Sequence, residues 1–185
     1  MTIAFSTSSP LVSVALITGL EGCVWEGSEP SRAAASQACM LLLGRGLAET
    51  GLDLTQVEIF AADLGPGSFT GVRVGVVIAK TLAWANGQMC VGADAFDLID
   101  PDGVVFLPSR KGEFFVREPG RSPFKLVGTP EGATGYGPGA RDRFPLASRF
   151  AGILGRLTPI KPEELVPGYL IEPSISEPNK PLSKI

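Results

Sequence analysis

A largely apolar run, Val57–Leu64, leads directly into a glycine-rich turn, Gly65–Gly71. An apolar run without polar alternation is typical of a strand that is covered on both faces. The segment after the turn, Val72–Asn86, has the length and pattern of a helix, and Gly87 follows it as an end signal. Strand, turn and helix in this order build parallel sheets, so this segment predicts an α/β fold.

The residues on either side of this unit extend the sheet. Alternating apolar residues and the Ser8-Ser9-Pro10 turn predict a hairpin at the N-terminus. Three antiparallel strands that feed a parallel crossover give a mixed sheet with flanking helices. The expected elements are strands at Thr2–Thr7, Leu11–Thr18 and Cys23–Glu26, a helix with Ser31 as its N-cap that runs to Thr50 before Gly51, a strand at Gln88–Ala93, and a helical turn at Asp94–Asp100.

Pro101-Asp102-Gly103 marks a boundary, so we expect an N-terminal lobe at 1–100 and a shorter C-terminal lobe at 101–185. Three predicted strands open each half, which indicates a duplicated architecture. The expected elements of the second half are strands at Val104–Leu107, Glu113–Arg117 and Phe124–Val127, a loop at Gly128–Gly139, an amphipathic helix at Leu146–Leu157, and a proline-dotted tail from Pro159.

The chain of 185 residues contains no histidine. Without imidazole there is no Ser-His-Asp triad, no Cys-His pair and no HExxH zinc site. The three cysteines, Cys23, Cys39 and Cys90, have no CxxC spacing, so neither a disulfide framework nor a zinc ribbon is predicted. We expect them to be small buried residues in a reducing cytosol, and we expect no metal site.

Charge and hydropathy exclude two further classes. Sixteen basic and 19 acidic residues give a net charge of −3, which argues against a free-standing nucleic-acid-binding protein. The longest apolar stretch, Val72–Ala85, contains Arg73 and Lys80 and is too short to cross a bilayer. No basic segment precedes the first apolar run, so no signal peptide is predicted. The expected location is the cytoplasm, with no membrane partner.

The glycine-rich turn permits two interpretations. Gly65 and Gly67 allow positive φ and close backbone approach, Pro66 stiffens the turn, and Ser68 or Thr70 can cap the following helix. Such a turn is either a structural elbow between strand and helix or a phosphate cradle at the helix N-terminus. It is not a Walker A loop, because no GK[ST] follows.

As a sequence, Gly65-Pro66-Gly67-Ser68-Phe69-Thr70-Gly71-Val72-Arg73-Val74-Gly75, with Ala79-Lys80 downstream, resembles the signature of the TsaB (YeaZ) family. The resemblance is dense over the first 95 or so residues. Further matching segments are Ile3–Ser8, Val12–Leu16, Arg110 with Gly112 and Glu113, Gly135–Gly139, and Pro167–Leu170. Departures from the family pattern are Ser6, where the family usually has aspartate, Pro108 and Ile171.

The resemblance implies an actin-like (ASKHA) fold with two lobes, the second abbreviated. It also implies a non-catalytic subunit in bacterial tRNA threonylcarbamoyladenosine synthesis, which supports a TsaD-type transferase together with a TsaE-type ATPase. The chain alone is expected to form a homodimer, and to meet tRNA only through the complex. No catalytic residue and no resident cofactor are expected, and ATP or ADP at a subunit joint is left open.

The resemblance also suggests site residues. The motif Gly65, Pro66, Gly67, Ser68, Phe69, Thr70, Gly71, together with Arg73, would contact phosphate or a partner. For Arg73 the alternative is a surface arginine paired with an acid such as Asp63. Lys80 is expected to be a surface lysine, and Trp25 and Trp84 to be packing residues.

Small residues on two predicted helices mark the expected partner interface, because they permit close helix packing. The alternative is that these residues pack on the chain's own sheet. The expected interface residues are Ala35, Cys39 and Leu42 on the first helix, and Val72, Gly75, Val76, Ala79 and Ala83 on the second.

The sequence also bears on three other functions. An autonomous actin-like ATPase or phosphotransferase needs acidic residues around Mg²⁺ and phosphate, and Ser6 argues against it. A metallopeptidase would need a set of zinc ligands, and this sequence offers no plausible one. A purely structural homodimer without a tRNA role is the third alternative, which binding to a TsaD-type subunit would distinguish.

Overall fold

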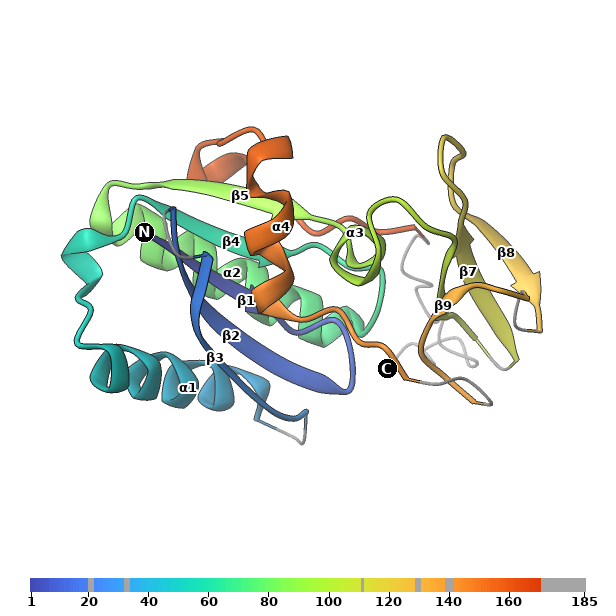
Figure 1. Ribbon diagram of the computed structural model, residues 1–185, viewed down its shortest axis with the longest axis horizontal. Coiled ribbons are helices and arrows are strands. Elements are labelled where there is room, and N and C mark those ends of the chain that lie inside the picture. Colours follow the sequence, from blue (N-terminus) through green and yellow to red (C-terminus); the bar gives the residue numbers. More distant parts are fainter. Residues whose placement is uncertain (20–21, 32–33, 111, 129–130, 139–141, 171–185) are drawn as a thin grey trace, which may run out of the picture.

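Two β-sheets lie next to each other in the computed structural model, which describes residues 1–19, 22–31, 34–110, 112–128, 131–138 and 142–170 (Figure 1). The first sheet has the strand order β3-β2-β1-β4-β5. Strands β1, β2 and β3 are antiparallel neighbours, whereas β4 runs parallel to β1, and β5 parallel to β4. Its strands are β1 (Thr2–Ser6), β2 (Leu11–Thr18), β3 (Gly22–Pro30), β4 (Ile59–Asp63) and β5 (Met89–Ala93).

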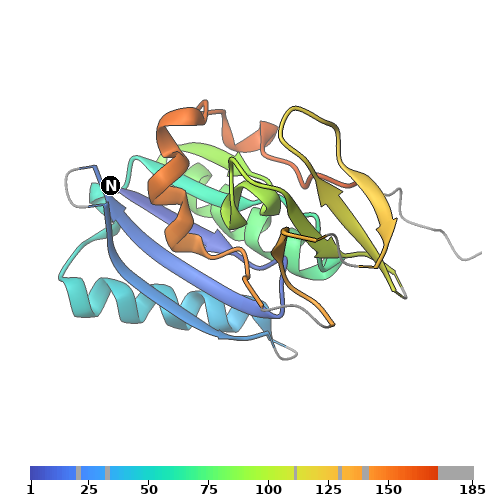
Figure 2. The ribbon, with the colours of Figure 1, turned by 45° about the vertical axis from the view of Figure 1, so that its right-hand side comes forward.

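Both faces of the first sheet are buried. Helices α1 (Ala35–Thr50) and α2 (Phe69–Asn86) cover one face, where Phe5 and Phe60 lie in the core. The other face is covered by a segment that returns from the C-terminal half, with Phe150 at its centre. Figure 2 shows this segment and α2 on opposite sides of the sheet. Because both faces are covered, the central strands are apolar at successive positions, as the run at Val57–Leu64 predicted.

The second sheet repeats part of the first. Its order is β8-β7-β6-β9, in which three antiparallel strands are followed by one short parallel strand beside β6. The short helix α3 (Ala95–Ile99) packs against it through Phe96 and Ile99. Its strands are β6 (Val105–Pro108), β7 (Glu113–Arg117), β8 (Phe124–Val127) and β9 (Thr134–Gly135). The expectation of a duplicated architecture is therefore confirmed in strand order.

Several expected boundaries were wrong. The N-cap of α1 is Ala34 and not Ser31, whose backbone N–H donates instead to Pro10 O and so continues the β2–β3 edge. Strand β3 extends to Pro30, beyond the expected end at Glu26. Helix α2 begins at Phe69, because Ser68 accepts a hydrogen bond from Gly71 N and caps it.

The expected helix at Leu146–Leu157 is not one regular helix. A series of short turns takes its place. Gly152 and Gly155 lower the helix propensity of the segment, and packing against the sheet stabilises only part of it. Its parts are the 3₁₀ turn η2 (Ala147–Arg149), helix α4 (Phe150–Ile153) and the 3₁₀ turn η3 (Leu154–Arg156). Further 3₁₀ turns lie outside this segment, η1 (Leu54–Gln56) before β4 and η4 (Pro162–Glu164) after η3. The expected loop at Gly128–Gly139 contains β9 within its described part.

The division into lobes at 1–100 and 101–185 stays a prediction. Across it, Ser13 Oγ accepts a hydrogen bond of 2.9 Å from Ala147 N, and Ala147 is fully buried against the first sheet.

Among the described residues, no helix is long and apolar enough to span a bilayer.

Candidate functional site

The glycine-rich motif lies where β1, β4 and β5 end, the edge at which open α/β sheets bind ligands. The turn between β1 and β2 presses directly on it. Ser68 N donates to Ser8 O over 2.7 Å. A Cβ at Gly67 would lie 2.2 Å from Ser8 O, and one at Gly71 would lie 2.1 Å from Thr7 O. Only glycine fits at these two positions, because the opposing atoms are backbone.

Thr7 continues this contact into α2. Its hydroxyl donates to Gly71 O over 2.7 Å, and a Cβ at Gly75 would come within 2.5 Å of the same hydroxyl. The glycines of the motif therefore allow the hairpin turn and the first turns of α2 to touch.

Asp63, the last residue of β4, is the buried centre of the site. Its Oδ2 accepts from Ser8 Oγ at 2.5 Å and lies 2.7 Å from Ser6 Oγ, while Oδ1 accepts from Gly65 N at 2.8 Å. Ser6 Oγ is also 2.9 Å from Pro145 O, at the start of the segment that returns to the first sheet. The carboxyl group thus joins β1, the hairpin turn and the motif, and Ser6 extends the connection to the C-terminal half.

Burial raises the pKa of the Asp63 carboxyl, although the Ser8, Gly65 and Ser6 hydrogen bonds act in the opposite direction. Burial likewise raises the pKa of Asp94, at the N-cap of α3. The pKa of Tyr136 is raised by burial and, to a smaller extent, by the charge of Asp63. Among the described residues no cation forms an ion pair with Asp63, so the alternative in which Arg73 pairs with this acid was wrong.

The hydrogen bonds of the motif favour the structural elbow over the phosphate cradle. Gly65 N donates to Asp63, Ser68 N donates to Ser8, and Gly71 N donates to Ser68 Oγ. These amides are used within the chain, and the hairpin turn occupies the space against Gly67. These three amides are therefore not available to a phosphate in this arrangement. Gly65 also has φ of +86°, which favours glycine.

A C-terminal strap, residues 158–170, crosses β5 and α2 and ends beside the motif. Cys90 and Ile160 exchange two backbone hydrogen bonds of 2.9 and 2.8 Å. Lys80 Nζ donates to the carbonyl oxygens of Glu163 and Leu165 at 3.1 and 3.2 Å. Lys80 is therefore an anchor of the strap, a role that the expectation of a surface lysine did not include.

The end of the strap places a tyrosine on the motif. Gly168 N donates to Leu64 O over 2.9 Å, and the ring of Tyr169 stacks on that of Phe69 with centroids 5.1 Å apart. The Arg73 guanidinium lies 5.3 Å from the centroid of the Phe69 ring. Motif and strap together thus expose a stacked pair of rings with a guanidinium group beside it.

The structure places most of the expected interface residues in the chain's own core. Small side chains on α2 face the first sheet, so the alternative, packing on that sheet, describes them. Side chains buried in this way offer little surface to a partner, so a partner interface at these residues stays a prediction that their burial does not support. Buried in this way are Cys39 and Leu42 on α1, and Val72, Gly75, Val76, Ala79 and Ala83 on α2, whereas Ala35 is half-buried.

Exposed apolar side chains lie elsewhere on the same two helices. Trp84 is 76% exposed and Val77 57% on α2, and Leu41 is 63% and Met40 49% exposed on α1. Val77 and Trp84 are seven positions apart, so they share one side of the helix. A count of apolar residues on the side opposite the small-residue stripe could have identified them. The expectation that Trp84 is a packing residue was wrong.

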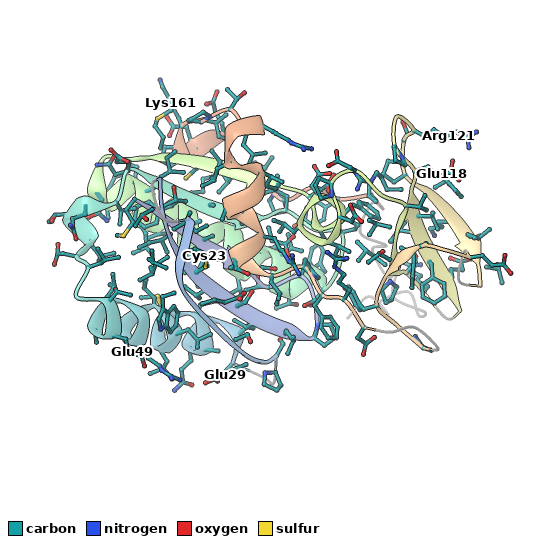
Figure 3. The ribbon with its side chains drawn as sticks, viewed as in Figure 1. Cys23, Glu29, Glu49, Glu118, Arg121 and Lys161 are labelled. Atoms are coloured by element: carbon teal, nitrogen blue, oxygen red, sulfur yellow. The ribbon has the colours of Figure 1, made fainter. Side chains whose placement is uncertain are left out.

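Two other expectations concern Trp25 and the cysteines. Trp25 packs against the α1 core as expected, and its Nε1 donates to Glu49 at 2.7 Å. Cys39 and Cys90 are buried as predicted, and burial raises the pKa of Cys90 to about 11. Cys23 is exposed, on the outer strand β3 (Figure 3), which contradicts the prediction. Within the described ranges, no three His, Cys, Asp or Glu side chains gather as metal ligands would.

Comparison with known proteins gives a consistent set of similarities. Residues 26–97 match the family described as TsaD, tRNA N6-adenosine threonylcarbamoyltransferase. The chain is 33% identical over 135 residues to the tRNA threonylcarbamoyladenosine biosynthesis protein TsaB of Haemophilus influenzae. That alignment covers 66% of this chain and 56% of the relative, so the chain spans little more than half the length of this curated relative.

Two solved structures from Pseudomonas aeruginosa show the same fold. One is YeaZ, with a TM-score of 0.71, 23% identity, and coverage of 91% of this chain and 99% of that chain. The other is described as an uncharacterized protein with similarity to peptidase YeaZ, with a TM-score of 0.75, 19% identity, and coverage of 92% and 99%. The expected actin-like α/β fold is confirmed by these similarities.

Proposed function

The chain belongs to the TsaB/YeaZ family, and from this premise we propose that it acts in tRNA threonylcarbamoyladenosine synthesis as a non-catalytic subunit that binds a TsaD-type transferase. The name of the Haemophilus relative supports the pathway. In the same proposal, a TsaE-type ATPase completes the assembly, the chain forms a homodimer when alone, and it meets tRNA as part of the complex.

The observation that carries the partner role is the exposed apolar surface of α1 and α2. Tryptophan is among the residues that contribute most to protein interfaces, and a side chain such as Trp84, 76% exposed, is left in water here. Val77 lies on the same side of α2, and Met40 and Leu41 project from the neighbouring helix α1. Burial of these four side chains against another subunit would remove apolar surface from water.

The buried polar centre supports the absence of a catalytic role. An actin-like phosphotransferase would need carboxylates that are open to Mg²⁺ and phosphate. Asp63 is instead fully buried and surrounded by hydrogen bonds from its own chain, and Ser6 stands where the family usually has aspartate. This arrangement holds the hairpin turn on the motif, which is a structural role.

The partner role can be tested by capture of the host's TsaD-type subunit on the tagged full chain. Val77→Glu and Trp84→Glu place a charge in the proposed interface, and we expect each to weaken capture by about 30-fold or more, as at an interface hot spot. Val127→Glu is the matched control, because Val127 is 81% exposed on the distant strand β8. Circular dichroism checks that every variant is folded.

Equal capture of Val77→Glu, Trp84→Glu and the parent would contradict the proposed interface. No capture by the parent would contradict the partner role itself. Steady ATP turnover by the isolated, pure chain would favour the autonomous ATPase or phosphotransferase instead.

A further inference from the structure

We propose that Phe69, Tyr169 and Arg73 form a contact surface for single-stranded RNA, in which an unpaired base stacks on the aromatic rings and a neighbouring phosphate pairs with the arginine. The inference rests on the proposed function, because it names the class of nucleic acid that the assembly would hold and the surface of this chain that touches it.

The geometry of the three side chains supports base stacking. The Phe69 and Tyr169 rings are 26° from parallel, with centroids 5.1 Å apart, and the Arg73 guanidinium lies over Phe69. The two rings remain 45% and 46% exposed. Proteins that bind single-stranded RNA recognise unstacked bases with such aromatic faces and with arginine planes.

The fold fixes this stack in place from two distant parts of the chain. Phe69 opens α2, directly behind the Ser68 cap, so its backbone is fixed by the motif. Tyr169 is positioned by the strap, through the Gly168–Leu64 hydrogen bond and the two carbonyl groups that Lys80 holds. Both rings are nearly half-exposed, so they contribute less to the core than fully buried aromatic residues do. An exposed, pre-organised aromatic pair suits a binding role.

The charge at the stack favours an anionic ligand. In the described part of the chain Arg73 has no carboxylate partner, and the first turn of α2 contains no acidic residue. The N–H groups of an arginine that has no carboxylate partner can donate to phosphate oxygens, whose geometry the guanidinium matches. The observations together favour RNA over an apolar protein segment, which would leave the Arg73 charge unpaired.

The test measures the affinity of the isolated full chain for a short fluorescein-labelled single-stranded RNA by fluorescence anisotropy at low salt. We expect Tyr169→Ala to weaken binding by about 5- to 100-fold, the range for loss of one stacking partner. Tyr169→Phe keeps the ring and should bind as the parent does. Arg73→Gln should lower the slope of log affinity against log salt by about 0.7, the value for one phosphate contact to a single strand.

Lys125→Gln is the charge-matched control, because Lys125 is an exposed cation on β8, and it should leave RNA affinity unchanged. The same variants are carried through the capture assay with the TsaD-type subunit. Loss of RNA affinity with capture retained supports the inference. If the parent fails in capture but binds RNA through Tyr169, the proposed function fails and the RNA surface stands.

Three outcomes overturn the inference. The first is a parent chain that does not bind the RNA at low salt. The second is Tyr169→Ala with parental RNA affinity, including the case in which it loses only capture, which would make the stack a protein contact. The third is that ATP displaces the labelled RNA as strongly as unlabelled RNA does and that ATP binding depends equally on Tyr169, which would indicate a mononucleotide site.

Discussion

The two sheets share a strand order but differ in how they are covered. In each, three antiparallel strands are followed by a strand parallel to the first of them, as in β3-β2-β1-β4 and β8-β7-β6-β9. The first sheet has two long helices on one face and the returning segment 147–156 on the other. The second has the five-residue helix α3 on one face and a small cluster around Phe106 and Phe114 on the other.

The comparison shows that topology alone does not fix the size of a core. Strand β8 has four exposed residues at the free edge of its sheet, and the hairpin that ends in it is closed by an exposed Glu118–Arg121 ion pair (Figure 3). By contrast, Phe5 and Phe60 of the first sheet are completely buried. We therefore expect the first sheet to carry most of the stability, and the site residues with it.

The largest expected effect sharpens this difference. Phe60→Ala should lower the free energy of unfolding by about 3–5 kcal/mol, since it empties a fully buried position. Phe114→Ala, in the small cluster of the second sheet, should cost less and act locally. Both tryptophans lie in the first sheet and its helix, so urea titrations followed by tryptophan fluorescence report on that part. Equal losses for the two variants would contradict the comparison.

A second prediction concerns the contact of motif and hairpin turn. Gly71→Ala should destabilise the chain by about 1–3 kcal/mol or more, because its Cβ would meet Thr7 O at 2.1 Å. Gly44→Ala on α1 is the matched control, since no atom lies within 4 Å of its Cβ, and it should stabilise by about 1 kcal/mol through helix propensity. Thermal unfolding measures both. A Gly71→Ala variant as stable as the parent would show that the turn can move away.

A third prediction tests the link between the halves. Ser13→Ala removes the acceptor of the buried Ala147 N–H, and an unsatisfied buried donor costs about 1–3 kcal/mol. We expect faster amide hydrogen exchange over 147–156 than in the parent, with β8 unchanged. Exchange that increases equally in both regions would mean that the segment is not a separate cover of the first sheet.

The smallest expected effect is a pH dependence. The folded chain raises the pKa of Asp63 above its ordinary value of 3.8, so it keeps this proton to a higher pH than the unfolded chain does. Stability from this group is therefore present at low pH, and it falls as pH rises through the folded pKa. Asp63→Asn, which imitates the neutral acid, should remove this part of the slope. The difference is measured from the urea midpoints of parent and variant between about pH 4 and 8, the range above the ordinary aspartate pKa. A steeper fall in the variant would contradict the assignment.

Much of the architecture could be predicted from residue order. The apolar run before Gly65 placed β4 inside the sheet, and Gly51 and Gly87 marked the ends of the two long helices. These signals are local, since a strand covered on both faces and a left-handed helix end each demand particular residue types at particular positions. The motif also indicated the family, because its exact order of residues is much rarer than a glycine-rich turn between a strand and a helix.

The interface that we propose on α1 and α2 could not be placed in the same way. Small residues such as Ala79 and Ala83 suit a close contact with any neighbour, and only the packed structure shows that this neighbour is the chain's own sheet. The roles of Lys80 and Tyr169 were hidden for a related reason, because their partners are far away in the sequence.

The sequence by itself determined the strands and long helices of the first sheet, their order and the family that the motif resembles, because each is encoded in neighbouring residues. Tertiary structure alone decided which side of each helix is exposed, that segment 147–156 covers the first sheet, and that Asp63 is buried among hydroxyl groups. These features depend on contacts between residues 55 to 139 positions apart, such as Ser8–Asp63 and Ser6–Pro145. The pattern of neighbouring residues does not show which distant residues will meet, because these contacts form only when the chain packs.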